Sequence, residues 1–102
     1  MGSLLDARLV VELWTSWASM LRVYSAAHGL SSARHAVVEV GADEIVLRVD
    51  TQWTRFTHEE MTTSGGVSRG FAMEVDGRVR IGDVTEDMDM AAEEVARGML
   101  IR

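Results

Sequence analysis

The sequence predicts an α+β fold in which a long N-terminal helix packs on a curved antiparallel sheet of four or five strands, followed by a C-terminal helix. Three observations predict it. Apolar residues recur with helical spacing up to about residue 28, alternate with a period of two from residue 34 onward, and return to helical spacing after residue 83. A helix and a sheet that each carry one apolar face bury those faces together, so a two-layer sandwich is the simplest arrangement.

The first helix is predicted to begin at Ser3-Leu4-Leu5-Asp6, which has the spacing of a capping box. One face of this helix is apolar and comprises Leu9, Val10, Leu13, Trp14, Trp17, Met20, Leu21 and Tyr24. The helix is predicted to end at His28-Gly29-Leu30, because glycine readily adopts the left-handed conformation that caps a helix.

A hairpin is predicted to follow. Apolar residues alternate on both sides of the turn Gly41-Ala42-Asp43-Glu44, and they comprise Ala36, Val38, Val40, Ile45, Leu47 and Val49. A four-residue loop pairs Val40 with Ile45 and Val38 with Leu47, which places this apolar set on one face of the sheet. Val37 and Val46 are then expected on the outer face.

A third strand is predicted over residues 52–62. Trp53 and Phe56 have opposite parity within it, so they would point to opposite faces of a regular strand. Either a bulge near Thr54 corrects the phase, or both faces of the strand are covered.

A second hairpin is predicted from residues 67–74 and 78–81. A three-residue loop ending at Gly77 pairs Met73 with Val79 and Phe71 with Ile81, and it gives Gly77 a positive φ. The final helix is predicted to begin at Asp83-Val84-Thr85-Glu86, a second capping box. Its apolar face comprises Met88, Ala91, Ala92, Val95, Ala96, Met99 and Leu100.

Length and composition predict a single domain over residues 1–102. The chain is 47% hydrophobic, which is enough for one core of ordinary density and too little for two. It contains no cysteine, so disulfides and thiolate metal sites are excluded. No apolar run is long enough to span a membrane, and a cytoplasmic protein without membrane association is expected.

The net charge of −6 is concentrated near the C-terminus. Residues 83–94 hold six acidic side chains and no basic one. Nucleic acid is therefore not expected as a partner, because the strongest field on the molecule would repel phosphates. A basic protein could dock on this acidic segment, and its affinity would then fall with added salt.

The segment Gly66-Val67-Ser68-Arg69-Gly70 matches the G-x-S-x-G pattern of serine hydrolases. That chemistry needs a helix after the serine and a histidine further along the chain. Here the following residues read as a strand, and the last histidine, His58, precedes the serine. The segment is interpreted as a glycine-flanked loop that leads into a strand.

No metal or other cofactor is expected. His28, His35 and His58 fall in different predicted elements and lack the spacing of metal ligands. Residues 83–94 place acids at the spacing of a calcium loop, but the sixth position is Met88 where such loops require glycine. His58 and Glu60 would share one face of a strand, where an exposed strand end is the preferred interpretation.

Several apolar residues fall outside the predicted core. Val11 and Ala18 widen the stripe of the first helix past Trp14, while Met90 and Ile101 project from the acidic face of the last helix. This surplus predicts a second buried surface, which closed homodimers commonly supply. We therefore expect a homo-oligomer with Trp14, Met90 and Ile101 at its interface.

The function favoured by the sequence is that of a small non-enzymatic binding domain, whose partner is a protein or a small apolar ligand. A ligand pocket is expected between the long helix and the sheet, lined by Trp17, Tyr24, Trp53 and Phe56.

The alternative is a small pocket enzyme. In it, Asp50 or His58 would act as the general base and Arg55 would hold an anionic group. The predicted element order is similar, at the level of architecture only, to cystatin-like domains, including the pocketed proteins of the NTF2-like type. No sequence motif carries this similarity, and a shared architecture does not establish an activity.

Overall fold

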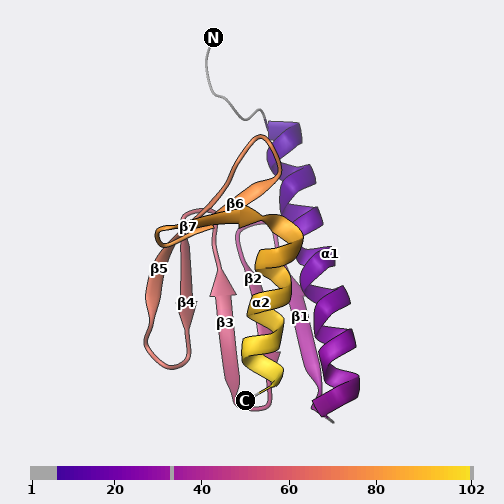
Figure 1. The fold of residues 1–102 in the computed structure, drawn as a ribbon. Coiled ribbons are helices and arrows are strands. Elements are labelled where there is room, and N and C mark those ends of the chain that lie inside the picture. The colour runs from indigo at the N-terminus through magenta and orange to yellow at the C-terminus, as the bar shows by residue number, and fades with distance from the viewer. Residues whose placement is uncertain (1–6, 33, 102) are drawn as a thin grey trace.

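The computed structural model describes residues 7–32 and 34–101, which form two helices and one antiparallel sheet (Figure 1). The elements follow the chain as α1 (Ala7–Ser32), β1 (Ala36–Val40), β2 (Ile45–Val49), β3 (Gln52–Phe56), β4 (Glu60–Thr63), β5 (Ser68–Met73), β6 (Arg78–Ile81), β7 (Val84–Asp87) and α2 (Met88–Leu100). The α+β class is confirmed, but the sheet has seven strands instead of four or five and is not strongly curled. The capping box predicted at Ser3–Asp6 lies outside the described residues.

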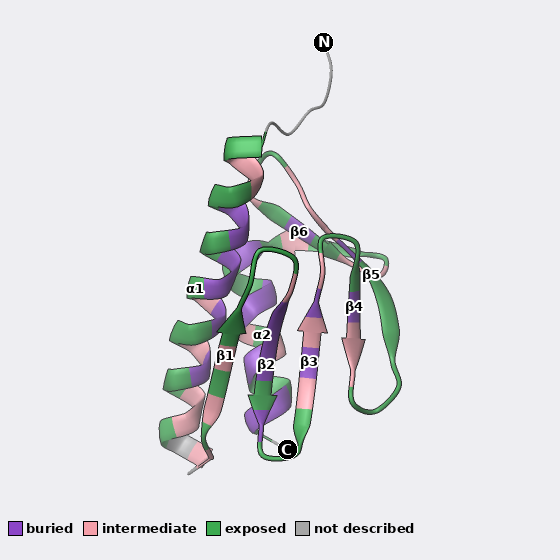
Figure 2. Ribbon diagram, turned by 180° about the vertical axis from the view of Figure 1, so that it is seen from behind, coloured by how far each residue is buried: buried purple, intermediate pink, exposed green. Residues whose placement is uncertain are grey.

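Both helices lie on the same face of the sheet. Figure 1 shows α1 beside the edge strand β1 and α2 in front of β2 and β3, and Figure 2 shows the opposite face of β1–β4 without a helix. The strands follow one another in the sheet in chain order, so every connection is a hairpin. Neither helix, over its described residues, is long and apolar enough to cross a membrane.

The first hairpin forms in the predicted register. Val40 pairs with Ile45 and Val38 pairs with Leu47. Ile45 and Leu47 are fully buried beneath the helices, as a strand with one apolar face requires.

The predicted end of the first helix is wrong, because α1 continues through His28-Gly29-Leu30 to Ser32. His28 does not cap the helix. Its Nε2 donates to Oε2 of Glu93 in α2 at 2.8 Å, which ties the two helices together. Gly29 serves close packing, because a Cβ there would lie 3.0 Å from the carbonyl oxygen of Arg34 as the chain returns toward β1.

The single strand predicted over residues 52–62 is divided into two strands, β3 and β4. β3 ends at Phe56, and Thr57 then forms a turn in which its Oγ1 accepts from the backbone N–H groups of Glu59 and Glu60 at 3.2 and 3.0 Å. The β2–β3 register is regular through Thr54, so the bulge that we considered there does not form. Trp53 and Phe56 accordingly point to opposite faces of β3.

The second hairpin confirms the predicted three-residue loop. Met73 pairs with Val79 and Phe71 pairs with Ile81, and the N–H of Glu74 donates to the carbonyl of Arg78 at 2.8 Å. Gly77 has the predicted positive φ, at 88°.

The predicted start of the last helix is wrong by four residues, because the N-cap is Asp87 and not Asp83. Val84–Asp87 forms β7, which pairs with β6, and α2 begins only at Met88. Gly82 has φ 62° and, with Asp83, makes the two-residue turn that joins β6 to β7. Gly-Asp between two period-two segments is a hairpin signal in the sequence, and our prediction did not take it into account.

The core centres on Trp17 of α1. Its ring packs edge-on against Phe56 at 5.2 Å between centroids and lies 5.5 Å from the ring of Phe71. The predicted apolar face of α2 is confirmed, with six of its seven residues buried and Val95 partly buried. A smaller cluster of Leu47, Val49, Met99 and Leu100 closes the other end of the layer.

A second aromatic contact joins the β1–β2 and β3–β4 loops to α1. The rings of Trp14 and His58 stack with 4.1 Å between centroids, and Trp14 Nε1 donates to the carbonyl of Gly41 at 2.8 Å. His58 Nε2 donates to the carbonyl of Ala42 at 2.9 Å. His58 is therefore more than the exposed strand end that the sequence indicated, since it joins the β3–β4 loop to both α1 and the β1–β2 loop.

These contacts predict that His58 makes a measurable contribution to the stability of the fold. We expect His58→Ala to lower the free energy of unfolding by about 1 kcal/mol, because it removes one aromatic stack and one hydrogen bond. Chemical denaturation measures the loss. The control is His35→Ala, which replaces an exposed histidine just before β1. Equal stability of the two variants would contradict the structural role of the Trp14–His58 stack.

Candidate functional site

A groove runs along α2 on the helix-bearing side of the sheet. Its larger part, about 420 Å³, lies between α2 and strands β3 and β4. A second part of about 280 Å³ continues toward β6 and β7, and both parts are lined by Met61, Glu94 and Val95. Because they share these residues, the two parts are neighbours along α2, and we call them together the α2 groove. Figure 1 shows β4 and β5 beyond α2 with no helix in front of them.

The floor of the α2 groove comes from the inner face of the sheet. Thr54 of β3 pairs with Thr63 of β4, and Phe56 pairs with Met61, so Thr54, Met61 and Thr63 share the face that carries the core. Thr54 is buried, and its Oγ1 lies 3.2 Å from Met99 Sδ of α2. This contact joins floor and wall at the base of the groove.

One stripe of α2 forms the wall. The lining residues recur at i, i+3, i+4, i+7 and i+8, which places them on a single side of a helix, and they are Ala91, Glu94, Val95, Gly98 and Met99. Gly98 is exposed within this stripe, and a Cβ at Gly98 would meet no atom within 4 Å. The wall therefore has a gap where a ligand could approach the helix backbone closely.

The far end of the groove combines apolar and charged groups. Ile81 and Val84 contribute apolar surface, and Val84 is largely exposed. Arg69 of β5 also lines this end, and its side chain packs against Gly82, where a Cβ would lie 3.5 Å from Arg69 Nη1. A ligand at this end would meet a guanidinium group as well as hydrocarbon.

Two carboxyl groups meet on the rim of the groove. The pKa of Glu86 is raised, first by a hydrogen bond with the Glu94 side chain, then by desolvation and by repulsion from Glu94 and Asp87. Protonation of Glu86 relieves this repulsion. The rim is thus less negative at acidic pH than the count of its carboxyl groups suggests.

The lining of the α2 groove is mainly hydrocarbon and thioether. Its polar groups are the side chains of Gln52, Thr54, Thr63 and Ser64 in the larger part, Arg69 and Glu86 in the smaller part, and Glu94 in both. Among residues 7–32 and 34–101, no group of three or more metal-ligating side chains comes together. Ser68 of the G-x-S-x-G segment begins a strand, as predicted, and its Oγ donates to Oε2 of Glu60 at 2.8 Å.

The four residues predicted to line a ligand pocket do not surround one cavity, because three of them lie in or against the core. Trp17 and Phe56 are fully buried and fill the space between α1 and the sheet with their own rings. Tyr24 is partly buried against the same core. Only Trp53 lines the α2 groove, at its open end beside Gln52.

The three residues considered for catalysis are also separated. Asp50 lies in the β2–β3 turn with φ 57° and is exposed, 4.0 Å from Arg34, while His58 lies beyond the other end of β3. At about 3.3 Å per residue, a strand of this length holds the two side chains on the order of 20 Å apart. Arg55 points to the outer face and pairs with Glu44. No shared pocket contains them.

The residues predicted at an interface fall into two groups. Trp14 is buried against His58, so its ring is already covered within the chain. Met90 and Ile101 are 52% and 48% exposed. Their exposure agrees with the predicted projection from α2, and their place in an interface stays a prediction.

Sequence reasoning missed most of the α2 groove. Met61 fell in a segment predicted as one long strand, and Gly98 drew no attention. The sequence did contain an indication of the groove at Gly98. A glycine within a helix lowers its stability, so a glycine there points to a place where space or a close approach to the backbone is required. The apolar stripe of α2 is also wider than one packing face needs.

No protein family, curated protein or solved structure matches this chain. What the α2 groove binds is therefore inferred from its own shape and chemistry.

The raised pKa of Glu86 predicts a pH-dependent stability. The folded state favours the protonated form, so this contribution is present below pH 4.5 and is lost as the pH rises through the raised pKa. We expect Glu86→Gln to gain stability relative to the wild type as the pH rises from 4 to 7, by roughly 0.5 kcal/mol or less, the usual size of an exposed like-charge pair.

Urea denaturation across this pH range measures the difference. Glu59→Gln, which removes an exposed carboxylate in the β3–β4 loop, is the control for loss of one charge. A constant difference between Glu86→Gln and the wild type would show that Glu86 and Glu94 do not interact.

Proposed function

We propose that this protein is a non-enzymatic binding domain whose α2 groove holds an elongated apolar ligand, such as an aliphatic chain. The observation that carries the proposal is the pair of adjacent hollows that follow α2 and share Met61, Glu94 and Val95. The separation of Asp50, Arg55 and His58 supports binding over catalysis as its role.

The size and lining of the groove support an apolar ligand. Its larger part, about 420 Å³, falls in the range of about 300–1,000 Å³ that is usual for small-molecule sites. Val67, Val95 and Met99 give this part a predominantly apolar lining. An apolar ligand gains about 25 cal/mol for each Å² that it buries in such a site.

The shape of the groove supports an elongated ligand over a compact one. The two parts follow one helix and meet at Met61 and Val95, so a chain could lie along both. Met61 and Met99 have flexible, polarisable side chains that adapt to ligands of different width. Arg69 and Glu86 line only the smaller part, and Glu94 lies where the two parts meet, so a ligand with a polar head would place that head in the smaller part.

The binding site is tested by filling the gap at Gly98. We expect Gly98→Leu to weaken binding of the neutral apolar dye Nile red at least about tenfold, which corresponds to 1.4 kcal/mol. A Cβ at Gly98 meets no atom within 4 Å, and because Gly98 lines the groove, the rest of the leucine side chain would take up space that a ligand needs. It also replaces glycine within a helix, so the variant should be as stable as the wild type or more stable.

Gly70→Leu is the matched control. Gly70 pairs with Glu60 on the outer side of the sheet, and a Cβ there would also meet no atom within 4 Å. It adds the same apolar group outside the groove. Dye fluorescence unchanged by Gly98→Leu, or lost equally in both variants, would refute the proposed site. Native mass spectrometry of the protein purified from cells would then identify a natural ligand by its mass.

A further inference from the structure

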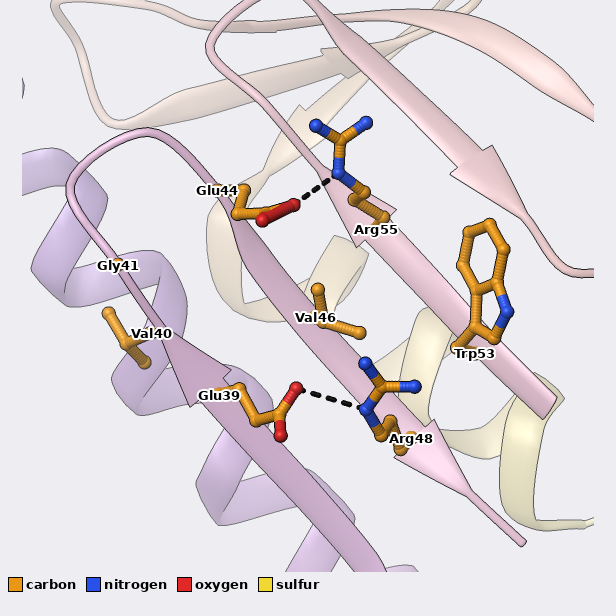
Figure 3. A pocket seen from close by; sticks show the side chains of 8 residues that line it. All are labelled: Glu39, Val40, Gly41, Glu44, Val46, Arg48, Trp53 and Arg55. Carbon is orange, nitrogen blue, oxygen red and sulfur yellow. Dashed lines mark hydrogen bonds and ion pairs between the residues drawn. The ribbon is translucent and has the colours of Figure 1, made fainter. Parts of the chain in front are cut away.

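The face of the sheet that carries no helix has an ordered pattern of charged and apolar side chains. A hollow of about 370 Å³ lies on this face, formed by β1, β2 and β3. Figure 3 shows the side chains that line it. Two ion pairs flank its centre, Glu39 with Arg48 at 2.9 Å and Glu44 with Arg55. Val46 lies between the two pairs, and we call this surface the outer face.

The centre of the outer face is apolar. Val46 pairs with Glu39 and with Arg55 across the sheet, and only 8% of its surface is exposed although no helix covers it. Val37, on the same face, is 54% exposed, and Trp53 is partly exposed. Exposed apolar residues around a buried one are typical of the centre of an interface, where aromatic residues contribute strongly to binding.

The hollow on the outer face, formed by β1–β3, is electrically neutral in a protein of net charge −6. It carries two carboxylates and two guanidinium groups, and each of these side chains is about half exposed. A partner of strong charge would be favoured by a face of a single sign. A balanced face is suited to a partner that is balanced in the same way.

The order of the charges gives this face self-complementarity. In Figure 3 both carboxylates lie on one side of Val46 and both guanidinium groups lie toward the other side. Consider a two-fold axis that lies in the plane of the face and passes through Val46, with the carboxylates on one side of it and the guanidinium groups on the other. Rotation about this axis turns a second copy over, so that its carboxylates lie above the guanidinium side of the first copy. Each carboxylate of one copy then lies opposite a guanidinium group of the other copy.

We propose that the outer face binds a second copy of this chain, forming a two-fold dimer in which the two sheets pack face to face. Sheets packed in this way lie about 10 Å apart, which the side chains of both faces fill. Trp53 and Val37 would be covered in the dimer, and the four charged side chains would form pairs between copies as well as within them.

The distribution of the remaining charge favours this arrangement. The acid-rich segment, residues 83–94, belongs largely to β7 and α2, and α2 lies on the opposite side of the sheet from the outer face (Figures 1 and 2). Face-to-face packing of the sheets therefore holds the two acidic helices apart. Contact through α2 would instead bring like charges together.

Charge reversal tests the proposal by sedimentation velocity. The wild type is expected at twice the chain mass of 11.3 kDa. The acidic-face variant Arg48→Glu/Arg55→Glu and the basic-face variant Glu39→Arg/Glu44→Arg should each sediment as monomers, with the dimer dissociation constant raised about a hundredfold or more by like-charge contact. Circular dichroism checks that both variants keep the fold.

Mixing the two variants provides the decisive measurement. The acidic-face and basic-face copies complement each other, so an equimolar mixture should form heterodimers although neither variant dimerises alone. Monomers in the mixture, or homodimers of either variant alone, would overturn the proposal. The second result would place self-association on another surface, such as the one around Met90 and Ile101.

A measurement on the wild type keeps the test valid if a variant does not fold. Trp14 and Trp17 are buried, so acrylamide quenching of tryptophan fluorescence reports mainly on Trp53. Quenching should decrease as protein concentration rises and the outer face becomes covered. Sedimentation as a monomer at every concentration, or quenching that stays the same while the sedimenting mass changes from monomer to dimer, would refute the proposed interface and would leave the Nile red test of the α2 groove unaffected.

Discussion

The width of the sheet relative to two helices is the constraint on which the rest of the structure depends. Strands lie about 4.8 Å apart and a helix with its side chains is about 10 Å wide, so two helices cover roughly four strands. The sheet has seven strands. With α1 beside β1 and α2 over β2 and β3, part of the helix-side face stays open. The α2 groove results from this difference in width, and its apolar lining is surface that a third helix would otherwise cover.

The core holds the groove in place because both depend on the position of α2. Trp17, Phe56 and Phe71 join α1 to the sheet, and Met88 and Ala92 of α2 belong to the same buried cluster. One side of α2 is thereby fixed against the core, and the adjacent side becomes the groove wall. The two faces of the sheet also differ in charge. The helix side carries most of the acid-rich segment, while the hollow on the outer face is balanced, so the proposed ligand site and the proposed dimer surface are separate.

Elements stabilised by local contacts were predictable from the sequence. Both β-hairpins with strong alternation were confirmed with their registers, and Gly77 has the positive φ that a three-residue loop requires. The errors lie where local signals compete. Capping-box spacing at residues 83–86 indicated a helix, but pairing with β6 makes this segment a strand. Thr57 divides the third predicted strand through a side-chain turn that the alternation of apolar residues did not reveal.

By itself, the sequence determined the α+β class, the amphipathic faces of both helices and the registers of two hairpins, because apolar periodicity and loop length act over a few residues. Only the tertiary structure decided which side chains line a site. Trp17 and Phe56 were expected in a pocket and instead fill the core, while Gly98 and Met61, distant in the chain, face one groove. The physical reason is that the open surface depends on how many strands two helices cover, and no short segment of the chain encodes that number.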